Sequence, residues 1–339
     1  MSGAKVVKKQ EQHLLNDWET ARRYLKIPTE AERNVYIGPN GLRWDLSGRH
    51  KGRQGVKLVG HLQGDYHQQF EQLFTEGAYQ VGATYERTNY TKKVINLGVA
   101  IGYNCSASAY AQIESNWWES WPPDQPGWWG RFTPWSGWRW TQVQLAKPVD
   151  TVMDISPTAF GNNGMQWDMQ IVAAKPWWAK RMLIETWSAH PDTVELQGHD
   201  EHTFHIANRG TIEAYPKFMY TGPGKCWVQD GMNDNMIPLP VLSEDDGFVT
   251  VDTDPAERTF KGSNDPVDNL FYSYIRSSRV LDFFLHDLGA LGEPVWRRAN
   301  GIRFNAAIPP KTVAHIKVRH SDETGKVVCL MPQRYRRPA

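Results

Sequence analysis

Three histidines and two acids lie close together in the second half of the chain and have side chains that bind metals. They are His199, His202 and His205, with Asp200 and Glu201 beside the first. Imidazole and carboxylate groups are ordinary zinc ligands, but they must converge on one point. On an extended strand His199 and His205 share one face, whereas His202 points to the other. The spacing therefore argues against a metal site, and we expect no cofactor.

Two nearby aspartates, Asp252 and Asp254, are the other candidates for chemistry, because glycosidases act through a pair of carboxyl groups. In a strand they share a face about 7 Å apart, and Pro255 then ends the strand. We interpret both as local hydrogen-bond acceptors. The chain has no Gly-x-Ser-x-Gly elbow, phosphate-binding Gly-rich loop or His-Glu-x-x-His helix. We therefore expect that it is not an enzyme.

Tryptophan has an unusual distribution, because eight of the 16 tryptophans lie between Asn116 and Trp140. They are Trp117, Trp118, Trp121, Trp128, Trp129, Trp135, Trp138 and Trp140. Four prolines in this stretch exclude a long helix, so we expect the rings on turns and short extended pieces. Three interpretations stay open: a local core, a protein contact surface anchored by tryptophan, or a platform that stacks sugars. No pattern of carboxylates and amides around the rings favours the sugar platform.

The composition excludes several classes of protein. At 339 residues the chain suits two domains. Its formal net charge of +1 gives no field that would draw it to nucleic acid or to an anionic membrane. Cys105, Cys226 and Cys329 are far apart and odd in number, which indicates thiols in a chain made in a cytosol. We find no secretory signal and no apolar run long enough to span a membrane.

Residues 1–30 predict an amphipathic helix that acts as an arm and ends at Pro28. Its contact face consists of Leu14, Trp18, Ala21 and Leu25. This face either covers the protein's own sheet or reaches a neighbouring subunit, and the pattern does not separate the two.

Residues 31–146, which include the Trp-rich segment 116–140, predict a domain of short strands. Val35–Ile37 and Leu42–Leu46 flank a tight turn. Between Tyr66 and Gly77 the apolar residues take helical spacing, which predicts a helix.

Residues 147–339 predict a second domain of at least seven short strands, as in a β-sandwich. Among the expected strands are Trp167–Ala173, Ala179–Trp187, Val194–Leu196, Thr203–Ala207, Ile302–Asn305 and Thr312–Val318. Asp265 and Pro266 form a helix start, which predicts a helical insertion at about residues 265–288. The fold class expected is mainly β with a few helices.

An ordered succession of turn signals runs from Phe204 to Thr259. It comprises Asn208–Gly210, Ala214–Pro216, Thr221–Gly224 and Val249–Pro255. This succession resembles the C-terminal region of distal tail proteins of long-tailed, siphovirus-type bacteriophages, often labelled minor tail proteins in phages of actinobacteria. The segments Gly41–Trp44 and Gly55–Leu58 are similar to the N-terminal domain of that family.

The resemblance implies an N-terminal ring-forming domain, a C-terminal galectin-like β-sandwich and a structural role without chemistry. Proteins of this family form a hexameric ring that joins the tail tube to the baseplate or tail-tip hub. The implied partners are further copies of the chain, the tail tube protein, the tape measure protein, and the hub and other minor tail proteins. The implied location is the tail tip of a virion assembled in the host cytoplasm.

Two other functions stay open. A carbohydrate-binding tail protein would use the Trp-rich segment to bind a host surface glycan during adsorption, and a cell-wall hydrolase would act on the envelope. The N-terminal helix, the Trp-rich segment and the helical insertion depart from the compact form of the family.

Overall fold

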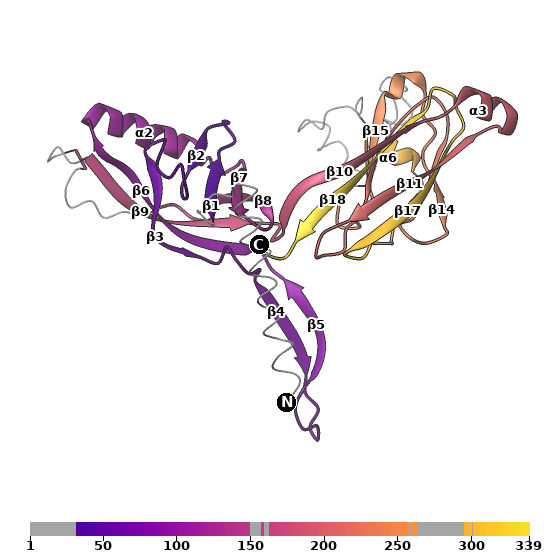
Figure 1. Ribbon diagram of the computed structural model, residues 1–339. Helices are drawn as coiled ribbons and strands as arrows, with labels where there is room; N and C mark the ends of the chain where they lie inside the picture. Colours follow the sequence, from indigo (N-terminus) through magenta and orange to yellow (C-terminus); the bar gives the residue numbers. More distant parts are fainter. Residues whose placement is uncertain (1–31, 150–156, 159–162, 258, 263–294, 300) are drawn as a thin grey trace, which may run out of the picture. The chain divides into compact units, whose positions relative to one another are not determined.

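The computed structural model describes residues 32–149, 157–158, 163–257, 259–262, 295–299 and 301–339. They form two compact units, drawn in Figure 1. The first unit contains the chain up to Ala179 together with Arg336–Ala339, and the second contains Lys180–Tyr335. The expected N-terminal helix and the expected helical insertion lie outside the described residues.

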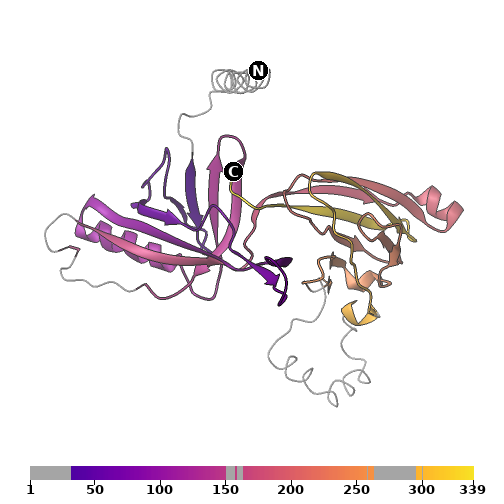
Figure 2. The ribbon, with the colours of Figure 1, turned by 90° about the horizontal axis from the view of Figure 1, so that it is seen from below.

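The first unit is built around the long strand β6 (Lys93–Cys105), which pairs antiparallel with β3 (Val56–Gln63) and with β9 (Asn163–Ala173). Ile95, Leu97, Val99 and Ile101 share one face of β6 and are fully buried, and Ala100 on the other face is fully buried as well. Helix α2 (Ala107–Glu119) packs along β6 and β9, as Figures 1 and 2 show. The period of two along β6 thus places one apolar face under the helix.

A second group of strands completes the first unit. Here β1 (Arg33–Ile37) pairs with β2 (Arg43–Asp45) and with β7 (Gly127–Thr133), and β7 pairs with β8 (Gly137–Leu145). The end of β8 also pairs with β9. The strands expected at both sides of the turn after Ile37 are therefore present.

Helix α2 was not anticipated. It begins after Ser106, whose hydroxyl oxygen accepts a hydrogen bond from a first-turn backbone N–H at 3.2 Å. Its buried face carries Tyr110 and Trp117. Trp117 and Trp118 therefore lie on its last turn, and the expectation of turns and extended pieces was wrong for these two. The prolines that exclude a helix start only at Pro122, after α2 has ended.

The helix expected between Tyr66 and Gly77 is absent, and this prediction was wrong. The segment forms β4 (Phe70–Thr75), which pairs with β5 (Thr84–Tyr90) in a two-stranded hairpin. Every residue of β4 is exposed. Because neither face of this hairpin is buried, its apolar residues follow no strand period, and their helical spacing was misleading.

The second unit is a β-sandwich of two sheets. One sheet holds β10 (Trp178–Ser188), β18 (Lys326–Tyr335), β12 (Lys217–Thr221), β15 (Phe248–Asp252) and β16 (Phe260–Gly262), in that order. The other sheet holds β11 (Asp200–Asn208), β17 (Thr312–His320), β13 (Cys226–Gln229) and β14 (Met236–Pro238). Among the described residues of this unit there are also three short helices: α3 (Pro191–Gln197), η1 (Glu244–Asp246) and α6 (Val295–Arg298).

The core of the second unit lies between the two sheets. Phe204 and Ile316 come from one sheet, Phe218 and Val327 come from the other, and all four belong to one buried apolar cluster. The expected fold class, mainly β with a sandwich in the C-terminal part, is confirmed.

The predictions of two strands in this unit were wrong. Val194–Leu196 lies in α3, which has Pro191 in its first turn and Gly198 as a left-handed C-cap, so helix-end residues were present in the sequence. Ile302–Asn305 forms no strand.

The first unit also extends further along the chain than the expected domain start at residue 147. The reason is β9, which pairs with β6 and β8 and so keeps the chain with the first unit as far as Ala179.

Candidate protein-interaction surfaces

Three of the eight clustered tryptophans are core residues. Trp117, Trp121 and Trp129 are almost fully buried. The Trp121 ring stacks on Tyr36 with ring centroids 3.7 Å apart and planes 5° apart. The Tyr36 hydroxyl donates a hydrogen bond of 2.5 Å to the backbone oxygen of Ser120, and burial raises the pKa of this hydroxyl. These rings hold the end of α2 against β1.

The other five tryptophans do not form one surface. Trp118, Trp138 and Trp140 are half-buried, while Trp128 is 42% exposed and Trp135 is 73% exposed. The Trp138 and Trp140 rings stack on each other with centroids 5.2 Å apart. Trp128 and Trp129 are neighbours on β7, so they point to opposite faces of the sheet. A sugar platform that includes Trp129 would therefore need a side chain that lies in the core.

The other candidate residues are the N-terminal contact face, which lies outside the described residues, and the two aspartates, which form hydrogen bonds with basic side chains. Leu14, Trp18, Ala21 and Leu25 are not among the described residues. Asp252 accepts a hydrogen bond from Lys217, and Asp254 accepts one from Arg334 at 3.2 Å.

His199, His202 and His205 do not converge on one point. On β11, His202 stacks on the Trp187 ring, whereas His205 lies with its Nδ1 2.6 Å from Nδ1 of His315. The described part of the chain contains no group of three or more His, Cys, Asp or Glu residues that could hold a metal ion. It also contains no helix long and apolar enough to cross a membrane.

The most prominent surface of the first unit is the β4–β5 hairpin, residues 70–90, which we call the hairpin arm. Tyr79 and Val81 at its tip are fully exposed, and Phe74 and Tyr85 on its strands are about half exposed. The Phe74 and Tyr85 rings contact each other edge to face, with their centroids 5.9 Å apart. An isolated two-stranded hairpin is marginally stable in water, and grouped exposed apolar side chains mark interaction sites. The hairpin arm is therefore suited to a protein partner.

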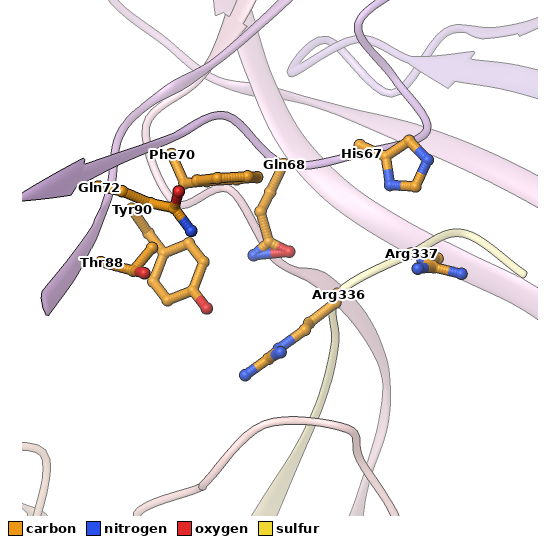
Figure 3. A pocket seen from close by; sticks show the side chains of 8 residues that line it. All are labelled: His67, Gln68, Phe70, Gln72, Thr88, Tyr90, Arg336 and Arg337. Atoms are coloured by element: carbon orange, nitrogen blue, oxygen red, sulfur yellow. The ribbon is translucent and has the colours of Figure 1, made fainter. Parts of the chain in front are cut away.

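A pocket of about 270 Å³ lies at the base of the hairpin arm. Figure 3 shows the side chains that line it: His67, Gln68, Phe70, Gln72, Thr88, Tyr90, Arg336 and Arg337. The Arg336 guanidinium lies 5.9 Å from the centre of the Tyr90 ring. The lining combines cations, amides and aromatic rings without a carboxylate, so it favours acidic or carbonyl groups of a partner.

A second, more basic pocket of about 580 Å³ lies near the start of β3. We call it the basic pocket. Its lining includes Lys51, Arg53 and Lys57, together with Tyr103 and Ile113. The Lys57 ammonium lies 4.2 Å from the centre of the Tyr103 ring. None of the three cations forms an ion pair with a carboxylate of the described residues.

Sequence reasoning missed both surfaces. The hairpin arm was mistaken for a helix, and the basic pocket joins residues from β3, β6 and α2 that are far apart in the sequence. The detectable signal was the segment from Leu46 to Gly64, which contains five Lys, Arg or His residues between Arg49 and Lys57 and no acid.

No protein-family model and no curated protein matches the sequence. Among solved structures, the chain is similar to the Dit protein (gp 19.1) of SPP1, described as a paradigm of the hub adsorption apparatus in phages that infect Gram-positive hosts. The match has a TM-score of 0.50 and 9% identity, and it covers 89% of this chain and 98% of that one. A chain of the phage p2 baseplate in its activated conformation with Sr matches with a TM-score of 0.47 and 10% identity, over 86% of this chain and 99% of that one. The first match shows that the two proteins share a fold.

Proposed function

We propose that the chain is a distal tail protein of a long-tailed bacteriophage, a structural component of the virion tail tip. The observation that carries the proposal is the fold shared with SPP1 Dit, because the match runs through 98% of that protein and includes both units of this chain. The order of turn motifs from Asn208 to Pro255 supports the same family independently of the fold.

In this function the first unit forms a ring with further copies of itself, and the β-sandwich of the second unit is displayed to other proteins. A ring requires a head-to-tail contact in which one patch meets a different patch on the next copy. The first unit carries two unlike surfaces of this kind, the apolar hairpin arm and the basic pocket. The ring is hexameric in this proposal, and it joins the tail tube protein and the tape measure protein on one side to the hub and other minor tail proteins on the other.

The alternative, a carbohydrate-binding tail protein, has less structural support. Of the eight clustered tryptophans only Trp128 and Trp135 are exposed, and Trp135 lies on the turn between β7 and β8. Sugar-binding platforms need rings that a ligand can reach, and Trp117, Trp121 and Trp129 are in the core.

The test is the native mass of the purified chain over a range of concentrations, with negative-stain images of the same samples. A closed six-fold ring is the expected result. Binding to purified tail tube and hub proteins is measured in parallel, because some rings form only on a partner. A chain that stays monomeric and binds neither protein contradicts the proposal, and a monomer that binds host glycans favours the alternative.

A further inference from the structure

We infer that in the proposed ring the hairpin arm of one copy docks in the basic pocket of the next copy. The inference rests on the proposed function and specifies which two surfaces meet. Its occupant is a second copy of this chain, and its chemistry is acidic and aromatic side chains meeting basic ones.

The two surfaces lie at opposite ends of the same pair of strands. At one end of the β3–β6 ladder Val56 pairs with Ile101, and the basic pocket includes Gly55, Lys57 and Gly102 beside them. At the other end Gln63 pairs with Asn96, and the chain continues from there into the hairpin arm. The eight residues of β3 span about 25 Å at roughly 3.3 Å per residue.

This separation sets the geometry of the contact. In Figure 1 the strands β4 and β5 extend from the rest of the first unit at the end of β3 and β6 that lies away from the start of α2. One copy therefore presents its arm at one end of the sheet and its pocket at the other, as a head-to-tail contact requires.

The charges of the two surfaces are complementary. The hairpin arm carries three exposed acids against a single cation, Arg87. Glu76 lies next to the tip and Glu86 is near it on β5, whereas Glu71 lies at the base of the arm. The basic pocket presents Lys51, Arg53 and Lys57 with no acid in its lining. Of the arm's acids only Glu86 is hydrogen-bonded within the arm, to the Thr75 hydroxyl at 3.0 Å. Complementary charge across an interface sets orientation and suppresses wrong pairings.

The apolar parts of the two surfaces are also compatible. The tip of the arm exposes Tyr79 and Val81 completely, and the basic pocket offers the Tyr103 ring and the Ile113 side chain. Its volume of about 580 Å³ falls within the roughly 300–1,000 Å³ of sites that enclose a ligand. Aromatic anchors in such pockets carry much of the energy of protein interfaces.

Each copy has one hairpin arm and one basic pocket, so the same contact repeats from copy to copy. If the rotation between copies is a whole fraction of a turn, the assembly closes. In the closed ring the apolar side chains of every hairpin arm are covered by the basic pocket of the next copy.

The test reverses the charge of each surface separately. The pocket variant carries Lys51→Glu and Arg53→Glu, and the arm variant carries Glu76→Lys, which reverses the charge of the acid next to the tip. Glu86 is left unchanged because of its bond to Thr75. The control is Glu195→Lys, an exposed residue of α3 in the second unit. Circular dichroism and thermal melting of each variant verify that it folds.

Native mass and negative-stain images then report assembly. Each variant alone is expected to lose the ring, with at least a tenfold rise in the concentration for half-assembly, because like charges now face each other. An equal mixture of the two variants is expected to form rings again, because every arm finds a pocket of opposite charge when the two kinds of copy alternate. The control forms rings as the wild-type chain does.

The outcomes separate this contact from the proposed function. Rings formed by either variant alone, or a mixture that does not assemble, overturn the arm-to-pocket contact and leave the distal tail function standing. A wild-type chain that never self-associates also overturns the contact, whereas the function is then judged by binding to tail tube and hub proteins.

Discussion

The hydroxyl of Ser120 links the end of α2 to the aromatic core of the first unit. Removing this hydroxyl lowers the free energy of unfolding by an amount that follows from its hydrogen bonds. Its Oγ accepts a hydrogen bond from Nε1 of Trp44 at 3.0 Å and donates one to the backbone oxygen of Asn116 at 2.7 Å. Both Ser120 and Trp44 are buried. Ser120→Ala leaves the indole N–H without this partner, and an unsatisfied buried donor costs about 1–3 kcal/mol. We expect the free energy of unfolding of the first unit to fall by about 2 kcal/mol.

A double-mutant cycle isolates the hydrogen bond. In a Trp44→Phe background the indole N–H is already gone, so Ser120→Ala loses only the hydrogen bond to Asn116 and should cost about 0.5–1 kcal/mol. The control is Ser115→Ala, an exposed position on the same helix, where the change should stay within about 0.5 kcal/mol.

The assay is amide hydrogen exchange read on peptides from α2 and β1, because a chain of two units does not unfold in one step. Equal costs of Ser120→Ala in the two backgrounds would refute the reasoning. A variant that is destabilised and yet forms rings when cooled would place this tryptophan cluster in the core and not at a subunit contact.

Three further predictions follow from burial. Burial lowers the pKa of Lys93 to about 8, so the unfolded chain binds more protons than the folded chain between pH 8 and about 10, and stability should rise with pH in that window; Lys93→Met should flatten this rise in thermal melts. Trp129→Ala should lower stability by about 3–5 kcal/mol, whereas Trp128→Ala should leave the melting curve within error, and similar losses would contradict their assigned burial. Titration with a thiol reagent should modify Cys105 in the native protein and the two buried cysteines only after denaturation; early reaction of all three would contradict the core of the second unit.

The sandwich could be predicted from the sequence because each of its strands buries one face, so apolar and polar residues alternate along the strand. Val249 and Val251 are buried in the core and alternate with polar neighbours, and turn residues mark the strand ends. Helix α2 is predictable from Ser106 as a cap and from Tyr110 and Trp117 seven residues apart, because the first proline, Pro122, lies beyond its end and does not disfavour it.

The interaction surfaces could not be predicted in the same way. No face of the hairpin arm is buried within the chain, so its apolar residues carry no period that identifies a strand. The basic pocket depends on register, because the pairing of Val56 with Ile101 brings Lys57 near Tyr103. Such a meeting of distant segments is a property of the folded sheet and leaves no local pattern.

The second unit is an insertion within the first, since the chain leaves the first unit at Ala179 and returns at Arg336. The outgoing strand β10 and the returning strand β18 are neighbours in one sheet. The last residues of the chain, which belong to the first unit, are bound by Arg139. Its side chain donates hydrogen bonds to the backbone oxygens of Arg337 at 2.5 Å and Ala339 at 2.8 Å. Inserted domains with adjacent ends are exchangeable modules. Replacing the sandwich with another domain whose ends are adjacent would therefore leave the strands of the first unit unbroken.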